Sequence, residues 1–344
     1  MVNERDAALQ LAYTGMHPER RMSLCIQRGG SSGVLAAIAK GSVAMPDAAV
    51  EASRVPAHRR LEALAEAGTT ALFLGDPGYP SRLAELANPP AVLFVAGHLP
   101  TAPGVAIVGT RKPTGYGVRL AERFGRALAR DGRTVVSGLA RGIDAAAHRG
   151  VVDEHGRGVA VLGNGVDRWY PAVNRPLSER LLNDGAVISE YPPGTRPSAW
   201  RFPPRNRIIV GLASIVLVVE AGMPGGAMIT ARMAVDEHRE LFAVPGDIGR
   251  GSSVGCNLLI RDGAWPVLGV DDLREAVDRV LGPVATPRAR TRESALLHAC
   301  DAAGTPIDEL AVRRHQTVAD LLVEITELEL AGLVRFDGGW VIPS

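Results

Sequence analysis

The residues of this chain that could do chemistry first appear where an apolar run gives way to glycine and positive charge. Residues 105–108 form a short apolar run, and Gly109, Thr110, Arg111 and Lys112 follow it, ahead of a segment with helical periodicity. A strand, a glycine turn and a helix in this order direct backbone N–H groups and the positive end of a helix dipole at one point. The stretch therefore predicts a phosphate site, and the alternative is a simple strand–helix turn with two solvated cations.

A second candidate lies in the stretch SGLARGIDAAAH, which contains a serine, an aspartate and a histidine. A hydrolase triad usually carries its serine on a G-x-S-x-G turn, but Val135 stands where the first glycine belongs. Asp144 and His148 are four residues apart on one predicted helix, so they can pair with each other. We interpret Ser137 and Gly138 as phosphate-binding turn residues and Asp144 with His148 as a structural pair, and we assign no catalytic residue.

Aromatic and cationic residues are interleaved in two further stretches. The first holds Trp169 and Arg175 after a predicted strand, and the second is RPSAWRFPPRNR, with four arginines, Trp200, Phe202 and no acid. Arginines neutralise phosphates, and aromatic rings stack on unpaired bases. Arg175 is thus a candidate phosphate ligand, and Trp169, Trp200 and Phe202 are candidate stacking residues; the alternative for Trp169 is that it covers the edge of the sheet.

Several other kinds of site are disfavoured. No G-x-G-x-x-G follows the first strand, and the second ends in Ser137 and Gly138, where an NAD site needs an acid; no G-K-[ST] triplet for ATP occurs. The three cysteines are scattered without zinc-ligand spacing. Glu220, before a glycine-rich turn, could be a catalytic acid, but we expect it to accept backbone N–H bonds and hold a loop. We therefore expect no cofactor and no metal.

The elements that must position these residues alternate regularly after residue 104. The predicted strands span 105–109, 134–138, 158–163, 185–190, 214–220, 240–244 and 266–268. The predicted helices span 118–131, 143–153, 175–183, 204–211, 227–238 and 255–261. Alternating strands and helices with Val-rich strands predict an α/β fold, a Rossmann-like parallel sheet with helices on both faces. Ligands of such sheets bind at the carboxyl ends of the strands, where the candidate residues lie.

The rest of the chain divides around this sheet. Residues 1–60 are predicted to be a helical N-terminal domain, and 61–281 the Rossmann-like domain, which opens with a transition of short helices and strands. Residues 282–292 are a Pro- and Arg-rich linker. Helices and a hairpin with an Asp-Gly-Gly turn in residues 293–344 predict a winged-helix domain.

Composition limits the location and the partners. The chain has 344 residues, 46% of them hydrophobic, and a net charge of +1, so nucleic acid would have to be drawn by a local patch. The charged N-terminus has no apolar run of signal-peptide length, and no apolar run is long enough for a membrane span. We expect a soluble, cytoplasmic protein.

Taken together, the motifs resemble those of the DNA-processing protein A family, DprA, also called Smf. They are IVGTR, SGLARGIDAAAH, LGNGVDRWYP-x-x-N, RFPPRNRIIVGL, VVEA, ITARMAVDEHRELFAVPGD and GCNLLIRDGA, preceded by YPSRLAELANPPAVLFVAG. The resemblance covers roughly residues 79–268 and implies an extended Rossmann fold that binds single-stranded DNA without sequence preference. It also implies a non-catalytic dimer that protects incoming DNA and helps to load the RecA recombinase, in natural transformation or in DNA repair.

The resemblance also implies a composition for the phosphate pocket. By position, Asn174, Arg205 and Arg207 would complete the pocket formed by residues 109–111, Ser137 and Gly138. Relatives often carry lysine in the turn after Tyr-Pro, where this chain has alanine and valine, so Arg168 or Arg175 would have to compensate.

An enzyme remains the alternative. The segment 223–226 resembles part of the PGG-x-GT-x-x-E motif of LOG-type phosphoribohydrolases, which act on nucleoside monophosphates, but no Glu stands at the matching helical position.

Overall fold

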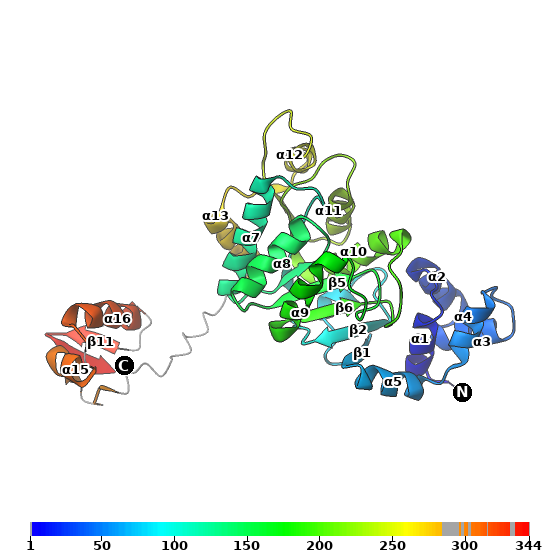
Figure 1. Ribbon diagram of the computed structural model, residues 1–344, viewed down its shortest axis with the longest axis horizontal. Coiled ribbons are helices and arrows are strands. Elements are labelled where there is room, and N and C mark those ends of the chain that lie inside the picture. Colours follow the sequence, from blue (N-terminus) through cyan, green and yellow to red (C-terminus); the bar gives the residue numbers. More distant parts are fainter. Residues whose placement is uncertain are drawn as a thin grey trace. The chain divides into compact units, whose positions relative to one another are not determined.

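The computed structural model describes residues 2–283, 296, 299–301, 304–314, 316–330 and 334–343, and the chain divides into two compact units at Gly282 (Figure 1). Most of the predicted linker, and most of the first residues of the predicted winged-helix domain, lie outside these residues.

The first unit begins with the five helices α1 (Glu4–Ala12), α2 (Pro18–Arg28), α3 (Ser31–Ala39), α4 (Asp47–Arg54) and α5 (Ala57–Glu66). Helices α1 to α4 share a small core, which includes Leu11, Met16, Val34 and Ile38. The boundary predicted between residues 60 and 61 falls inside α5, because that helix packs on the first strand of the sheet.

A nine-stranded sheet forms the centre of this unit, in the order β1-β2-β6-β5-β4-β3-β7-β8-β9. Its strands are β1 (Thr69–Phe73), β2 (Val92–Gly97), β3 (Gly104–Val108), β4 (Val135–Ser137), β5 (Gly158–Leu162), β6 (Ala186–Ser189), β7 (Ala213–Val218), β8 (Glu240–Ala243) and β9 (Trp265–Pro266). The seven strands β3 to β9 run parallel to one another, as predicted. In contrast, β2 pairs antiparallel with β6, and β1 pairs antiparallel with β2. The predicted transition segment thus extends the sheet.

Helices cover both faces of the sheet (Figure 1). They are α6 (Ser81–Ala84), α7 (Gly115–Arg130), α8 (Ile143–Asp153), α9 (Arg175–Asp184), α10 (Phe202–Gly211), α11 (Gly226–Asp236), α12 (Val254–Arg261) and α13 (Val270–Leu281), with short 3₁₀ helices η1 (Ala172–Asn174) and η2 (Ala199–Arg201). Helices α7 to α12 confirm the six helices predicted after residue 104, whereas α13 was not predicted.

Strand β3 shows why two helical layers are needed. Its five residues are all buried: Ala106 and Val108 pack with α10 and α11, while Val105 and Ile107 pack with α7 and α8. Successive side chains of a strand point to opposite faces, so an apolar strand without alternation must be covered on both sides. This burial fixes β3 at the middle of the sheet and holds its carboxyl end in place.

The second unit contains β10 (Thr305–Pro306), α15 (Ile307–Arg314), α16 (Val318–Leu330), β11 (Val334–Asp337) and β12 (Trp340–Pro343). The strands form an antiparallel sheet in the order β10-β12-β11. Gly338 and Gly339 make the predicted hairpin turn with φ of +57° and +87°, a region that favours glycine. Helices followed by a hairpin match the predicted winged helix.

Candidate nucleic-acid interface

A cavity of about 670 Å³ lies where β3 and β7 end. Gly109 and Thr110 line it after β3, and Ala221 and Gly222 line it after β7. Most of its remaining lining comes from the turn after β3, the segment around η2, the start of α10 and the start of α11, and Ala140, Asp144 and Tyr170 complete it. The cavity therefore occupies the carboxyl edge of the sheet, as predicted from the alternation of strands and helices.

Two cations stand in the turn after β3. Arg111 and Lys112 line the cavity and are exposed, and neither forms an ion pair with any residue that the structure describes. The turn is held from both sides, because Thr110 donates its N–H to the carbonyl of Glu220 at 2.7 Å and accepts the N–H of Lys112 on its hydroxyl at 3.2 Å. The positive charges are thus presented on an ordered turn, and among the described residues no carboxylate forms a close ion pair with them.

Two aromatic rings lie beside these cations. Tyr170 and Phe202 stack with their centroids 5.4 Å apart and their planes inclined by 24°. The guanidinium carbon of Arg111 lies 5.4 Å from the centroid of Phe202. Tyr170 is 46% exposed, so part of its ring is open to a further stacking partner.

Arg205 lines the same cavity but is held from behind. It is 5% exposed, and its Nη1 donates to the carbonyl of Gly138 at 2.8 Å and to that of Val161. Burial lowers the pKa of Arg205 to about 10, and the nearby carboxylate of Asp144 opposes this shift. The side chain stays cationic at neutral pH and is fixed at the floor of the site.

Asp144 also lines the cavity, and its Oδ2 accepts the N–H of Gly138 at 3.1 Å. Burial raises its pKa, and the charge of Arg205 opposes the shift. The predicted Asp144–His148 pair is wrong: no hydrogen bond or ion pair joins the two, both of which lie in the described part of the chain, because Asp144 is engaged by the backbone of Gly138. His148 is fully buried, and this burial lowers its pKa to about 3.

The start of α11 forms another part of the wall. Pro224, Gly225, Gly226 and Ala227 line the cavity, and no side chain caps this helix. The first N–H groups of a helix have no partner within the helix, so they are available to an acceptor in the cavity.

Several predicted ligands lie outside the cavity lining. Ser137 is fully buried, and its hydroxyl donates to the carbonyl of Ile107 at 2.6 Å. Asn174 is buried, and its amide donates to the carbonyl of Leu139 at 2.8 Å. Arg175 pairs with Glu179 one turn further along α9. The polar groups of Ser137 and Asn174 therefore serve the fold, whereas Arg175 forms an exposed ion pair on α9. Gly138 lies beneath Arg205 and Asp144, and Trp169 is half-buried outside the lining.

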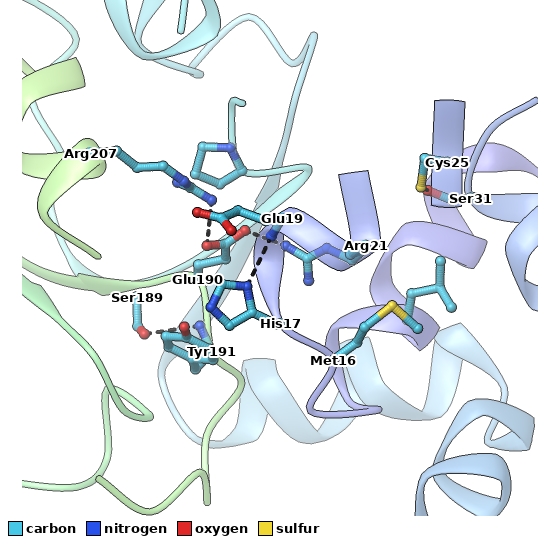
Figure 2. Close-up of polar contacts among 12 residues, drawn as sticks. Met16, His17, Glu19, Arg21, Cys25, Ser31, Ser189, Glu190, Tyr191 and Arg207 are labelled. Atoms are coloured by element: carbon cyan, nitrogen blue, oxygen red, sulfur yellow. Dashed lines mark hydrogen bonds and ion pairs between the residues drawn. The ribbon is translucent and has the colours of Figure 1, made fainter. Parts of the chain in front are cut away.

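Arg207 and Trp200 also lie elsewhere. Arg207 donates to the Oε2 of Glu190 at 2.6 Å, and Figure 2 shows this pair beside Arg21 of α2. Trp200 stacks on His17, with 5.2 Å between ring centroids. Both side chains contact the surroundings of α2 instead of facing the cavity, although their neighbours Phe202 and Arg205 line it.

Some of the predicted site residues line the cavity, and some residues of the lining were not among those predicted. Gly109, Thr110, Arg111, Lys112, Phe202 and Arg205 come together at the cavity. Tyr170, Asn206 and Thr230 line it as well but were not assigned. Tyr170 is next to Trp169 in the sequence, so the same aromatic stretch could have indicated it as a stacking residue. Which of the two rings faces the cavity depends on the direction of each side chain, which the sequence does not show. The interpretation of Glu220 is confirmed: its Oε2 accepts the N–H and the hydroxyl of Thr114, each at 3.0 Å.

Comparison with known proteins decides the family. Residues 70–278 match the sequence model of the family described as DNA recombination-mediator protein A, and residues 282–339 match the DprA winged helix domain. The chain belongs to the DNA recombination-mediator protein A family. Membership places the chain among proteins of DNA processing and recombination mediation. The two matches together cover the sheet domain and the winged-helix domain.

Individual DprA and Smf relatives agree with this assignment. Protein Smf of Synechocystis sp. is 36% identical over 307 residues, which cover 77% of this chain and 77% of the relative. DNA processing protein DprA of Streptococcus pneumoniae is 42% identical over 200 residues, which cover 58% of this chain and 71% of the relative.

Solved DprA structures share the fold. The crystal structure of DprA from Streptococcus pneumoniae has a TM-score of 0.65 and 31% identity, and the match covers 79% of this chain and 97% of that one. A structure concerning the single-stranded DNA binding mode of DprA from Helicobacter pylori has a TM-score of 0.56 and 27% identity, covering 61% of this chain and 96% of that one.

Within the described ranges, none of the helices combines the length and apolarity needed to cross a bilayer. The same residues contain no group of three or more His, Cys, Asp or Glu side chains arranged to hold a metal ion.

Proposed function

We propose that this chain binds single-stranded DNA without sequence preference, through the cavity at the carboxyl edge of its sheet. The observation that carries the proposal is the placement of Arg111 and Lys112, which form no close ion pair with a described residue, beside the stacked rings of Tyr170 and Phe202. Cations and exposed rings on one surface bind the backbone and the bases of an unpaired strand and read no sequence.

The residues have distinct roles in this proposal. Arg111 and Lys112 contact phosphates, helped by the uncapped N–H groups at the start of α11. Arg205 supplies a fixed positive charge at the floor, and Tyr170 offers a ring face to a base. We do not retain Arg207, Trp200, Ser137, Asn174 or Arg175 as DNA ligands, because their polar groups or rings already have partners in the protein.

The family supports the choice of partner. The Helicobacter pylori relative has a structure that concerns single-stranded DNA binding. On the same ground we propose that the chain acts as a recombination mediator with RecA in the cytoplasm and is not an enzyme. Two carboxylates near the cavity support the last point, since Asp144 accepts the N–H of Gly138 and Glu220 holds Thr114.

We also propose that the chain works as a homodimer. Strand β9 is at the end of the sheet, with Trp265 55% exposed there and Leu268 78% exposed just after it. A sheet edge with exposed large apolar side chains favours association with another chain. Light scattering on the purified protein would show twice the chain mass, and a single chain mass at all concentrations would contradict the dimer.

A fluorescence-anisotropy titration with labelled oligo-dT and with a matched duplex tests the main proposal. We expect tighter binding of the single strand, and we expect Arg111→Ala to weaken binding of oligonucleotides of every sequence. The slope of log affinity against log salt should fall by about one unit for each lost phosphate contact. Arg123→Ala, which removes an exposed arginine of α7 away from the cavity lining, is the matched control.

Equal affinity of Arg111→Ala and the wild type would refute the site. Release of adenine from adenosine monophosphate by the purified protein would instead support the phosphoribohydrolase alternative.

A further inference from the structure

A buried cluster of three charges joins α2 to the sheet. Glu190, the residue after β6, has a side chain that is only 3% exposed. Its Oε1 accepts from Nη2 of Arg21 on α2, and its Oε2 accepts from Nη2 of Arg207 on α10 at 2.6 Å. Figure 2 shows the two guanidinium groups reaching this one carboxylate from different elements. The cluster links residues that are 169 and 17 positions apart in the chain.

A second contact lies at the start of the same helix. His17, the N-cap of α2, stacks on Trp200 of η2 with 5.2 Å between ring centroids. Tyr191 meets the edge of Trp200, with its centroid 6.1 Å away. The guanidinium carbon of Arg201 lies 4.7 Å from the centroid of Trp200. Trp200 therefore has three protein groups against its ring, although 40% of the residue stays exposed.

These contacts fall at the two ends of one loop. Residues 190–201, here called the wall loop, run from the end of β6 to the end of η2, and α2 holds Glu190 at one end and Trp200 at the other. Pro197, Ser198 and Ala199 of this loop line the cavity. Helix α2 and its N-cap thus contact both ends of the wall loop, although no residue of α2 lines the cavity.

We infer that α2 positions the wall loop of the DNA site, and that Arg21 is a positioning residue for binding by the cavity. The inference rests on the proposed function, since it assigns α2 a role in the same site. Without Arg21, Glu190 keeps Arg207 as its ion-pair partner, but its Oε1 loses its hydrogen-bond donor. A buried acceptor left without a donor drives local rearrangement. That rearrangement would occur at the end of the wall loop and displace the residues that face the cavity.

The experiment compares Arg21→Ala with Arg20→Ala. Arg20 is the adjacent arginine of α2, is exposed, and donates to the carbonyl of Ala44, away from the wall loop. Both variants lose one positive charge, so a difference between them cannot come from net charge. We expect Arg21→Ala to weaken oligo-dT binding roughly tenfold and Arg20→Ala to leave it almost unchanged.

Three measurements separate positioning from the other roles that Arg21 could have. The salt slope should stay at the wild-type value in Arg21→Ala, because the residue contacts no phosphate. Hydrogen exchange should rise in the wall loop and stay unchanged in the turn at 109–112. Arg21→Lys, which keeps a donor and the charge beside Glu190, should restore most of the affinity. If Arg21→Ala fails to fold, Arg21→Gln, which keeps a donor without the charge, replaces it.

Equal affinities for Arg21→Ala and Arg20→Ala would overturn the inference, and so would a salt slope reduced by one unit. The two proposals fail differently: if the cavity is not the DNA site, Arg111→Ala binds normally as well, whereas loss in Arg111→Ala alone removes only the role of α2.

Discussion

The guanidinium of Arg111 and the ring of Phe202 lie 5.4 Å apart, although 91 positions separate them in the chain. Arg111 comes from the turn after β3 and Phe202 from the start of α10, so the contact joins two walls of the cavity. Phe202 also stacks on Tyr170, which makes its ring the shared partner of a cation and of a second aromatic ring. Charge and a stacking surface are thereby placed together in the proposed DNA site.

Tyr170 should provide the outer stacking face. Tyr170→Ala is expected to weaken single-strand binding by about 1–3 kcal/mol, the usual contribution of one stacked base, whereas Tyr170→Phe should keep most of the affinity. The measurement is an anisotropy titration at fixed salt. Equal losses in the two variants would assign the effect to the hydroxyl, and no loss in either would remove Tyr170 from the site.

Gly138 should not tolerate a side chain. A Cβ at this position would lie 2.6 Å from Nη2 of Arg205 and 2.6 Å from Oδ2 of Asp144, both of which are buried. Gly138→Ala is expected to lower the free energy of unfolding by about 1–3 kcal/mol through overpacking. Urea unfolding measures the change, and Gly251→Ala, with no atom within 4 Å of the added carbon, is the control. A wild-type midpoint for Gly138→Ala would show that the two side chains move aside freely.

The burial of His148 should make stability depend on pH. Its pKa is about 3 in the folded protein and 6.5 in the reference state, so the unfolded chain takes up a proton first as the pH falls below 6.5. The free energy of unfolding should therefore decrease by up to about 1.4 kcal/mol per pH unit in that window. The raised pKa of Asp144 acts in the opposite direction, because its contribution is present at low pH and is lost as the pH rises.

Urea unfolding at several pH values between neutrality and about pH 5 would measure this dependence. His148→Leu should flatten the curve, whereas His98→Gln, at an exposed histidine, should not. A pH dependence that is the same in wild type and His148→Leu would assign the effect to other groups.

Much of the fold follows from local sequence. Each strand from β3 to β7 is a short, mostly apolar run that is buried throughout, and such runs can be stable only when both faces are covered. The turn at Gly109–Lys112 could likewise be predicted as a cationic site, because its position after a buried strand places it at the carboxyl edge of the sheet. Strands β1 and β2 were found as strands but not assigned to the sheet, since pairing partners leave no local signal.

Only the tertiary structure decided which side chains face the cavity. Arg205 and Arg207 stand in one arginine-rich stretch, and both were expected in the pocket. Two residues apart on a helix they point about 200° from each other, so when Arg205 turns to the cavity Arg207 turns away. What Arg207 meets there, the carboxylate of Glu190, is supplied by a distant strand end, and Arg21 of α2 completes the cluster. The sequence determined which charges and rings were available. The packing of α2, β6 and α10 determined which of them remain for the proposed DNA contact, because a buried charge must find its partner within the protein.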